Sequence, residues 1–262
     1  MRLFDSHCHL DDAVFDRDRA EVLQRARAAG VQAMMVAGIN HASSLQAVHL
    51  AEREAGVYAA VGVHPHDVRH CSADQLAALR RLAGRPAVRA WGEIGLDFNR
   101  MYSPRADQEH WFLRQLETAD ALDLPLIFHE RDSGGRFLEL LRSRPRAARC
   151  GVVHCFSGSQ DELEAYLSLG LYIGITGILT FQGRGAVLRR MAACIPLERL
   201  LVETDAPYLT PAPEKNRTRR NEPAFVKSTL LCLAEVRGDA PEALAEAVWQ
   251  NTCRLFRIAG SL

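Results

Sequence analysis

Six side chains of the kinds that bind metal ions stand at or just after short apolar runs of this chain. They are two neighbouring histidines and four residues that each follow a separate run: His7, His9, Glu93, His129, His154 and Asp205. Two histidines at positions i and i+2 of a strand point the same way, so both imidazoles can reach one cation. Nitrogen and carboxylate ligands suit Zn, Mn or Fe, and also Mg when carboxylates and waters contribute more. Six ligands are too many for one tetrahedral zinc ion but fit two ions bridged by a carboxylate, either Glu93 or Asp205.

These residues can meet only where the fold brings the ends of their apolar runs together. The runs alternate with amphipathic stretches, a pattern that predicts strands alternating with helices. The expected strands are Leu3–His7, Ala33–Ala37, Tyr58–Val63, Val88–Ile94, Leu126–His129, Gly151–His154, Leu171–Ile175 and Leu200–Glu203. The expected helices are Arg17–Ala29, Ser43–Ala55, Ala73–Leu82, Arg105–Leu122, Arg136–Ser143, Gln160–Leu169, Ala186–Cys194, Pro223–Arg237 and Pro241–Phe256.

Eight strand–helix units in about 250 residues favour a (β/α)8 barrel, in which the carboxyl ends of all strands meet at one mouth. The competing fold is a doubly wound open sheet, which would offer a glycine-rich loop after an early strand. The first strand here ends instead in His7-Cys8-His9. No linker or low-complexity segment divides the chain. We therefore expect an α/β protein, a single barrel domain over residues 1–262 with an extra helix at its C-terminal end.

The composition excludes several kinds of function. The 32 basic and 32 acidic residues balance, which argues against a protein that coats nucleic acid by bulk charge. Only two of the basic residues are lysines, Lys215 and Lys227. A carboxylated lysine on the fourth strand therefore cannot bridge two metal ions, and Glu93 is the obvious substitute at that strand end. The same absence removes a Schiff-base mechanism from the strands.

The cysteines and the apolar runs indicate the cellular compartment. The seven cysteines are odd in number and contain no Cys-x-x-Cys pair, which predicts reduced thiols rather than a disulfide framework. No apolar run approaches the roughly 18 to 20 residues of a membrane span. The opening segment Met1–His7 turns polar too early for a secretory signal. We expect a soluble cytoplasmic protein, with no membrane association and no obligate protein partner.

Several longer motifs carry a family resemblance, and together they contain every candidate ligand except His129. They are Asp5-Ser6-His7-Cys8-His9-Leu10-Asp11, Gly62-Val63-His64-Pro65-His66, Gly92-Glu93-Ile94-Gly95-Leu96-Asp97, His154-Cys155-Phe156-Ser157-Gly158, Glu203-Thr204-Asp205-Ala206-Pro207-Tyr208-Leu209 and Arg220-Asn221-Glu222-Pro223. In order and over nearly the whole chain, they resemble the TatD family of metal-dependent deoxyribonucleases. The resemblance implies a barrel of the metallo-dependent hydrolase superfamily that cleaves DNA phosphodiester bonds with two divalent ions, which Mg, Mn or Zn would suit.

The resemblance also implies a role for each ligand. The first metal site would contain His7, His9, Glu93 and Asp205, and the second Glu93, His129 and His154. Asp205 would also accept the proton of the attacking water. Glu203 is implied in the site, either as an addition to the second metal site or as a residue that orients a ligand. His64 is implied as a histidine on the substrate side, with His66 as its neighbour.

Substrate contacts are expected from three arginines. The family pattern retains Arg131 after the fifth strand, but the following Gly134-Gly135 pair departs from it and puts the shape of that loop in doubt. Arg131 then either binds phosphate or forms a structural ion pair. Arg217 and Arg219 belong to the densest basic run, after the eighth strand, where barrels often bind phosphate. Tyr102 is one of four aromatic residues after strands or in loops that could stack on a base.

The resemblance favours an exonuclease whose substrate is DNA, as single strands or 3′ ends. Two other functions stay open at this point. A superfamily amidohydrolase or lactonase would use the same ions to activate water against the carbonyl of a small molecule. A catalytically idle binding or maturation protein would retain the fold without turnover, but the intact ligand positions weigh against it.

Overall fold

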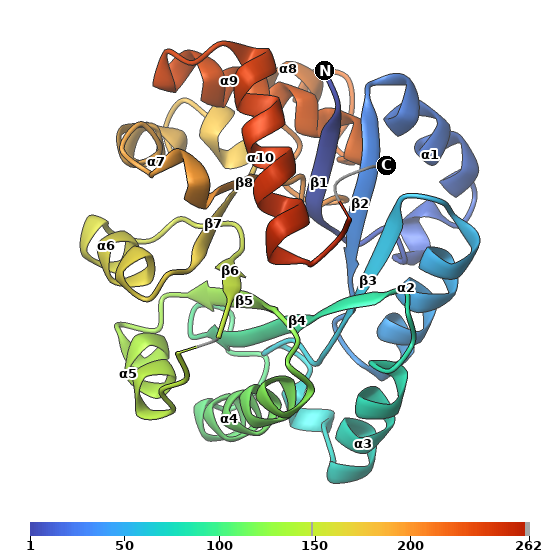
Figure 1. The fold of residues 1–262 in the computed structure, drawn as a ribbon, viewed down its shortest axis with the longest axis vertical. Helices are drawn as coiled ribbons and strands as arrows, with labels where there is room; N and C mark the ends of the chain where they lie inside the picture. The colour runs from blue at the N-terminus through green and yellow to red at the C-terminus, as the bar shows by residue number, and fades with distance from the viewer. Residues whose placement is uncertain (148, 260–262) are drawn as a thin grey trace.

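A ring of eight parallel strands forms the centre of the molecule (Figure 1). The structure is a computed structural model that describes residues 1–147 and 149–259. The strands neighbour one another in chain order: β1 (Leu3–Cys8), β2 (Val31–Ala37), β3 (Val57–Val61), β4 (Val88–Asp97), β5 (Leu126–Arg131), β6 (Gly151–Val153), β7 (Tyr172–Ile175) and β8 (Leu200–Val202). The ring closes just beyond β8, where the Asp205 N–H donates to the His7 carbonyl at 2.9 Å and the His9 N–H donates to the Ala206 carbonyl at 2.7 Å.

Helices surround the strands on the outside (Figure 1). The α-helices are α1 (Arg19–Ala28), α2 (His41–Arg53), α3 (Ala73–Leu82), α4 (Arg105–Leu122), α5 (Arg136–Ser143), α6 (Gln160–Ser168), α7 (Gly185–Ala192), α8 (Ala212–Lys215), α9 (Val226–Arg237) and α10 (Pro241–Leu255). Short 3-10 turns are η1 (Ala13–Phe15), η2 (Val68–His70), η3 (Gly177–Thr180), η4 (Leu197–Arg199) and η5 (Pro223–Phe225). The predicted (β/α)8 barrel with an additional C-terminal helix is confirmed, and α8 is an element that the periodicity did not predict.

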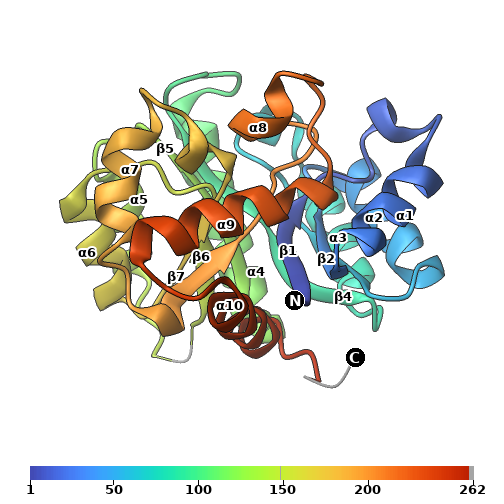
Figure 2. The same ribbon diagram turned by 90° about the horizontal axis from the view of Figure 1, so that it is seen from above.

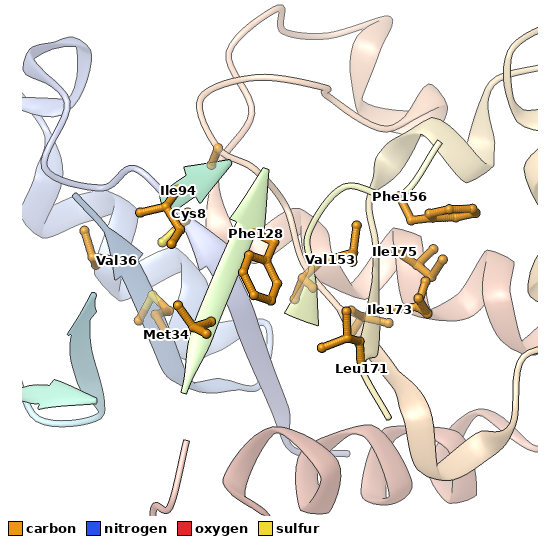
Figure 3. Close-up of a cluster of buried hydrophobic side chains, with 14 of the residues drawn as sticks. Cys8, Met34, Val36, Ile94, Phe128, Val153, Phe156, Leu171, Ile173 and Ile175 are labelled. Carbon is orange, nitrogen blue, oxygen red and sulfur yellow. The ribbon is translucent and has the colours of Figure 1, made fainter. Parts of the chain in front are cut away.

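Apolar side chains fill two layers of the barrel. The outer layer lies between strands and helices, and Figure 3 shows part of it, including Met34, Phe128 and Ile175. The inner layer takes residues from every strand and packs against α10: Phe4, Ala33, Met35, Ala60, Ala90, Ile127, Val152, Tyr172, Leu201, Trp249, Cys253, Leu255, Phe256 and Ile258. Trp249 of α10 packs against Phe4 with ring centroids 5.6 Å apart. The C-terminal helix therefore closes the amino-terminal end of the barrel.

Two breaks in strand register determine which residues face the barrel axis. Trp91 and Ile94 both belong to the outer layer although three positions separate them, and the pairing of β4 with β5 shifts between them. In a regular strand, residues three apart point to opposite faces, so the shift turns Glu93 inward. The pairing of β1 with β2 likewise shifts between Asp5 and Cys8. The shifts thus lie beside the candidate ligands of both strands.

The two ends of the barrel differ in what covers them. Figure 2 shows α8 on one side of the strands and α10, with the chain termini, on the other. Since α8 follows β8, its side is the mouth formed by the carboxyl ends of the strands. None of the helices in residues 1–147 and 149–259 combines the length and apolar character that a membrane crossing requires.

Candidate metal centre and active site

Glu93 lies at the centre of the mouth, and its two carboxylate oxygens face different sets of histidines. Oε2 lies 3.2 Å from Nε2 of His7 and 3.6 Å from Nε2 of His9. Oε1 lies 2.7 Å from Nδ1 of His129 and 2.9 Å from Nε2 of His154. One carboxylate thus connects two groups of nitrogen ligands, as a bridge between two cations must.

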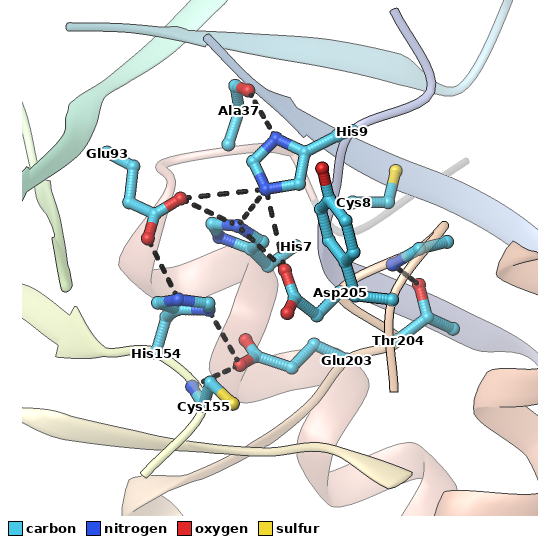
Figure 4. Close-up of polar contacts among 12 residues, drawn as sticks. His7, Cys8, His9, Ala37, Glu93, His154, Cys155, Glu203, Thr204 and Asp205 are labelled. Carbon is cyan, nitrogen blue, oxygen red and sulfur yellow. Dashed lines mark hydrogen bonds and ion pairs between the residues drawn. The ribbon is translucent and has the colours of Figure 1, made fainter. Parts of the chain in front are cut away.

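Asp205 completes the first group. Its Oδ1 lies 3.4 Å from Nε2 of His9 and 3.7 Å from Nε2 of His7 (Figure 4). The Asp205 side chain is 14% exposed and that of Glu93 only 2%. Asp205 is therefore the carboxylate of this pair that water reaches more easily.

The pKa shifts of the residues in the cluster show that it favours a cation. Burial alone would raise the pKa values of Glu93 and Asp205, but the histidines around them outweigh burial and lower both. Burial would likewise lower the pKa of His9, but Asp205 and Glu93 raise it to about 9. Burial would lower the pKa of His154 too, but Glu93 and Glu203 raise it well above its usual value. The carboxylates thus favour positive charge at these histidine nitrogens, which a divalent ion bound there would supply in place of protons.

The donor set fits divalent metal ions on independent grounds. His7, His9 and Glu93 offer ligand atoms that lie within 4.8 Å of one another, and so do Glu93, His129 and His154. The Nδ1 of His9 lies 3.0 Å from the Ala37 carbonyl, so that nitrogen carries the proton and leaves Nε2 free for a cation. The predicted binding of divalent metal is therefore supported by the residues present.

Glu203 is a buried carboxylate whose partners are residues around the cluster rather than Glu93 at its centre. It accepts hydrogen bonds from the Ser6 hydroxyl at 3.1 Å and from the Cys155 N–H, and its Oε1 lies 3.3 Å from Nδ1 of His154 (Figure 4). The other nitrogen of His154 faces Glu93. Of the two roles implied by the resemblance, this geometry favours an orienting residue, because a carboxylate behind a histidine fixes the ligand nitrogen that faces the cation.

Asp97 plays the corresponding part behind the other histidine of the second group. Its Oδ2 lies 3.3 Å from Nε2 of His129 and 2.7 Å from Nε2 of His66. Its Oδ1 accepts the N–H groups of Asn99 and Arg100. Asp97 was not among the predicted site residues. Its position four residues after Glu93 was the available signal, because an extended β4 brings both carboxylates to the mouth.

The Asp97→Asn variant is expected to lose about tenfold to a hundredfold in kcat/KM, the usual effect of removing a carboxylate behind a metal-binding histidine. An amide can present its NH2 group to His129 and disturb the orientation of that ring. Metal titration should show weaker binding of one ion. Asp132→Asn is the matched control, because Asp132 is exposed and accepts a hydrogen bond from Asn99. Equal metal affinity in Asp97→Asn and wild type would contradict the assignment.

The resemblance implied His64 as a histidine on the substrate side, but the structure places it directly beside Glu93. Its Nε2 is 3.3 Å from Oε1 of Glu93, and its ring packs edge-on against that of His129. Burial lowers the pKa of His64 to about 3, so its imidazole is neutral at ordinary pH. Its Nδ1 accepts the His66 N–H at 3.0 Å, so Nε2 carries the proton of the neutral ring and can donate to Glu93 or to a bound group.

The three arginines predicted to contact substrate have no acidic partner among the residues that the structure describes. Arg131 ends β5, and within residues 1–147 and 149–259 its guanidinium forms no ion pair or hydrogen bond. The same holds for the exposed side chains of Arg217 and Arg219 in the described part of the chain. By contrast, Arg220 pairs with Asp18 at 2.6 Å, so it belongs to the scaffold. Of the two roles open for Arg131, the structure gives no support to a structural ion pair.

Comparisons with known proteins bear directly on this arrangement. The chain matches the family described as TatD related DNase over residues 4–257. It belongs to that family. The chain is 44% identical to a Rahnella protein named 3'-5' ssDNA/RNA exonuclease TatD, covering 98% of this chain and 99% of that one. A Pantoea vagans protein of the same name is 43% identical, with 98% and 100% covered.

The solved structure of a TatD homolog from Escherichia coli K12 supports the same conclusion. It superposes with a TM-score of 0.89 at 32% identity, covering 98% of this chain and 99% of that chain. The sequence-based predictions of a TatD-type DNase, and of a hydrolase that acts on phosphodiester bonds, are therefore confirmed. The alternative of a small-molecule amidohydrolase is less supported.

Proposed function

We propose that this TatD-family protein is a 3′–5′ exonuclease that removes nucleotides from single-stranded DNA or RNA with two divalent ions. The observation that carries the two-ion proposal is Glu93, whose oxygens face two separate groups of histidines. The names of the relatives support the direction of cleavage and the single-stranded substrate. Mg or Mn are the first ions to test, and Zn the third.

The proposed residues divide into two ion sites. His7, His9, Glu93 and Asp205 would hold one ion, and Glu93, His129 and His154 the other. Bound there, the pair of ions would acidify a water molecule and neutralise the charge that builds up on the phosphate oxygens. Asp205 would take the proton of that water, because it is ionised and the more exposed of the two carboxylates at the first site.

The remaining residues orient the histidine ligands or bind the substrate. Glu203 keeps the ring of His154 in place, and Asp97 does the same for His129. Arg131, Arg217 and Arg219 would bind phosphates of the substrate strand, because none of them is neutralised by an acidic neighbour in the described residues. These three guanidinium groups would supply local positive charge for the substrate, although the chain as a whole has zero net charge.

Replacing both Arg217 and Arg219 with alanine is expected to raise KM for a single-stranded oligonucleotide. The logarithm of the affinity should also fall less steeply with the logarithm of salt concentration, by about 0.7 for each phosphate that the variant no longer neutralises. Arg190→Ala is the matched control, because Arg190 is an exposed arginine in the last turn of α7. An unchanged salt slope in the double variant would remove this loop from the binding site.

A time course with end-labelled oligonucleotides tests the proposed function. A single strand labelled at its 5′ end should shorten by one nucleotide at a time from the 3′ end with Mg, Mn or Zn, and not in excess EDTA. A blunt duplex of the same sequence should react more slowly, and RNA should react as DNA does. Internal cuts, a ladder that begins at the 5′ end, or full activity in EDTA would each contradict the proposal.

The proposal treats residues 1–262 as one catalytic domain without a protein partner. Two observations support it: α10 closes the base of the same barrel that carries the ligands, and those ligands come from strands throughout the chain. The seven cysteines are all free thiols, which supports a location in the reducing cytoplasm.

A further inference from the structure

Two exposed tyrosines stand beside opposite halves of the metal cluster. Tyr208 is 54% exposed, and its ring meets the ring of His9 edge-on with centroids 6.0 Å apart. Tyr102 is 53% exposed, and its ring meets that of His66 edge-on at 4.8 Å. A large aromatic residue that leaves over half of its surface in water at a catalytic mouth has apolar area available for a ligand.

The two rings approach the cluster from opposite sides of the barrel. Tyr208 lies in the segment after β8 and Tyr102 in the segment after β4, and these strands are four places apart in the ring of eight. Tyr208 adjoins the group of His7 and His9, whereas Tyr102 adjoins His66, which shares Asp97 with His129. The carboxylate of Glu93 lies between these two groups.

Hydrogen bonds fix the backbone that carries Tyr208. Its N–H donates to the Asp205 carbonyl at 2.8 Å, and its own carbonyl accepts a hydrogen bond from the buried side chain of Asn221 at 2.6 Å. The same Asn221 amide donates to the Thr204 carbonyl. The segment of Tyr208 is thus tied to the ligand Asp205.

The segment of Tyr102 is fixed in the same manner. Its neighbour Ser103 is fully buried and donates from its hydroxyl to the His66 carbonyl at 2.8 Å. The side chain of Gln108 donates to the Ser103 carbonyl at 2.8 Å. Because both segments are held independently of the tyrosine rings, each tyrosine projects from a fixed backbone, and over half of the surface of each residue is open to a ligand.

We propose that Tyr102 and Tyr208 stack on the two bases that flank the scissile phosphate. This inference rests on the proposed exonuclease function and names how its substrate is held. A phosphate at the bridged cluster has one nucleoside on each side of it, and the two tyrosines lie on the two sides of that cluster. Stacking on an aromatic ring accepts every base, because all bases have a π-face.

The arrangement accounts for a preference for single strands. Two neighbouring bases can lie against rings on opposite sides of a barrel only if they unstack from each other and from any paired strand. A duplex end would have to be opened first. The terminal base and the base before it would therefore be held by separate rings, and a strand shortened by one nucleotide would present an equivalent pair.

The test combines tyrosine variants with oligonucleotides that lack one base. Tyr102→Ala and Tyr208→Ala should each raise KM for a single-stranded oligonucleotide by about 5-fold to 150-fold, the range for loss of one base stack. Tyr102→Phe and Tyr208→Phe keep the ring and should stay within about 3-fold of wild type. Leu169→Ala is the control for loss of an exposed apolar side chain, since Leu169 follows α6 at the base of the barrel.

Substrates with an abasic residue at the terminal or the penultimate position assign each ring to a base. In wild type, either abasic residue should raise KM by a similar factor. Each alanine variant should become insensitive to removal of the base that its missing ring contacts, and remain sensitive to removal of the other. The metal-induced rise in melting temperature verifies that each variant folds and binds its ions.

Three outcomes would overturn the stacking proposal. They are an unchanged KM in both alanine variants, an equal sensitivity of all variants to both abasic residues, or phenylalanine variants as defective as the alanine ones. If the proposed exonuclease function itself is wrong, the result differs: wild type would leave every oligonucleotide intact under all metal conditions.

Discussion

Glu93→Gln is expected to lower kcat on a single-stranded oligonucleotide by about a thousandfold or more. Glutamine has the size of glutamate, but only one of its two terminal atoms can bind a cation. The group that faced Oε2 or the group that faced Oε1 would then meet an NH2 donor. The bridge between the two histidine groups is lost whichever way the amide turns, and metal analysis should find fewer than two ions bound.

The control for this variant is Glu130→Gln. Glu130 is a half-buried carboxylate of the neighbouring strand β5, and its partners are the N–H and hydroxyl of Ser133 rather than the cluster. It should keep both ions and most of the activity. Two ions bound by Glu93→Gln with kcat within about tenfold of wild type would mean that Glu93 is not a bridge.

The sequence was sufficient to predict which residues gather at the mouth, because a barrel brings strand ends together whatever their separation along the chain. His129 and His154 lie 25 positions apart in the sequence, yet both face Oε1 of Glu93. The near-absence of lysine was equally informative. It left Glu93 as the candidate bridge on β4, and in the structure its two oxygens face the two groups of histidines.

The direction of each side chain was less predictable. Simple alternation along β4 would send Glu93 to the same face as Trp91, which packs outside the barrel. The break in register that turns it inward depends on tertiary pairing with β5. Gly92, which precedes Glu93 with a positive φ, is a residue type that often marks such a bulge, but it does not fix which way the next side chain points. Alternation also does not place Glu203 and Asp205, because β8 ends at Val202 and both residues follow it.

The residues behind the ligands were the least predictable. Asp97 was visible in the sequence as a polar residue near the end of an apolar strand, but its partners His66 and His129 come from other parts of the chain. The role of Glu203 depends on contacts with Ser6, His154 and Cys155, the first of which lies nearly 200 residues away in the linear sequence. Such hydrogen bonds follow from the closed barrel and become evident only in three dimensions.

Asp205→Asn is expected to lower kcat by about a hundredfold to ten-thousandfold, the usual contribution of a proton acceptor positioned at the reacting group. The amide keeps an oxygen that can bind a cation, so part of the first ion site survives. It cannot take a proton from water, because its oxygen is far less basic than that of a carboxylate. The neighbouring Glu93 cannot replace it, since its side chain is only 2% exposed and both its oxygens face histidines.

Saturation with metal separates the two roles proposed for Asp205. If Asp205 served only as a ligand, raising the Mn concentration until both sites fill should restore kcat to near the wild-type value. If it also accepts the proton, kcat should remain at least about a hundredfold low with two ions bound. Asp161→Asn is the matched control, because Asp161 is an exposed carboxylate in the first turn of α6. Full recovery of Asp205→Asn at saturating metal would assign proton transfer to another group.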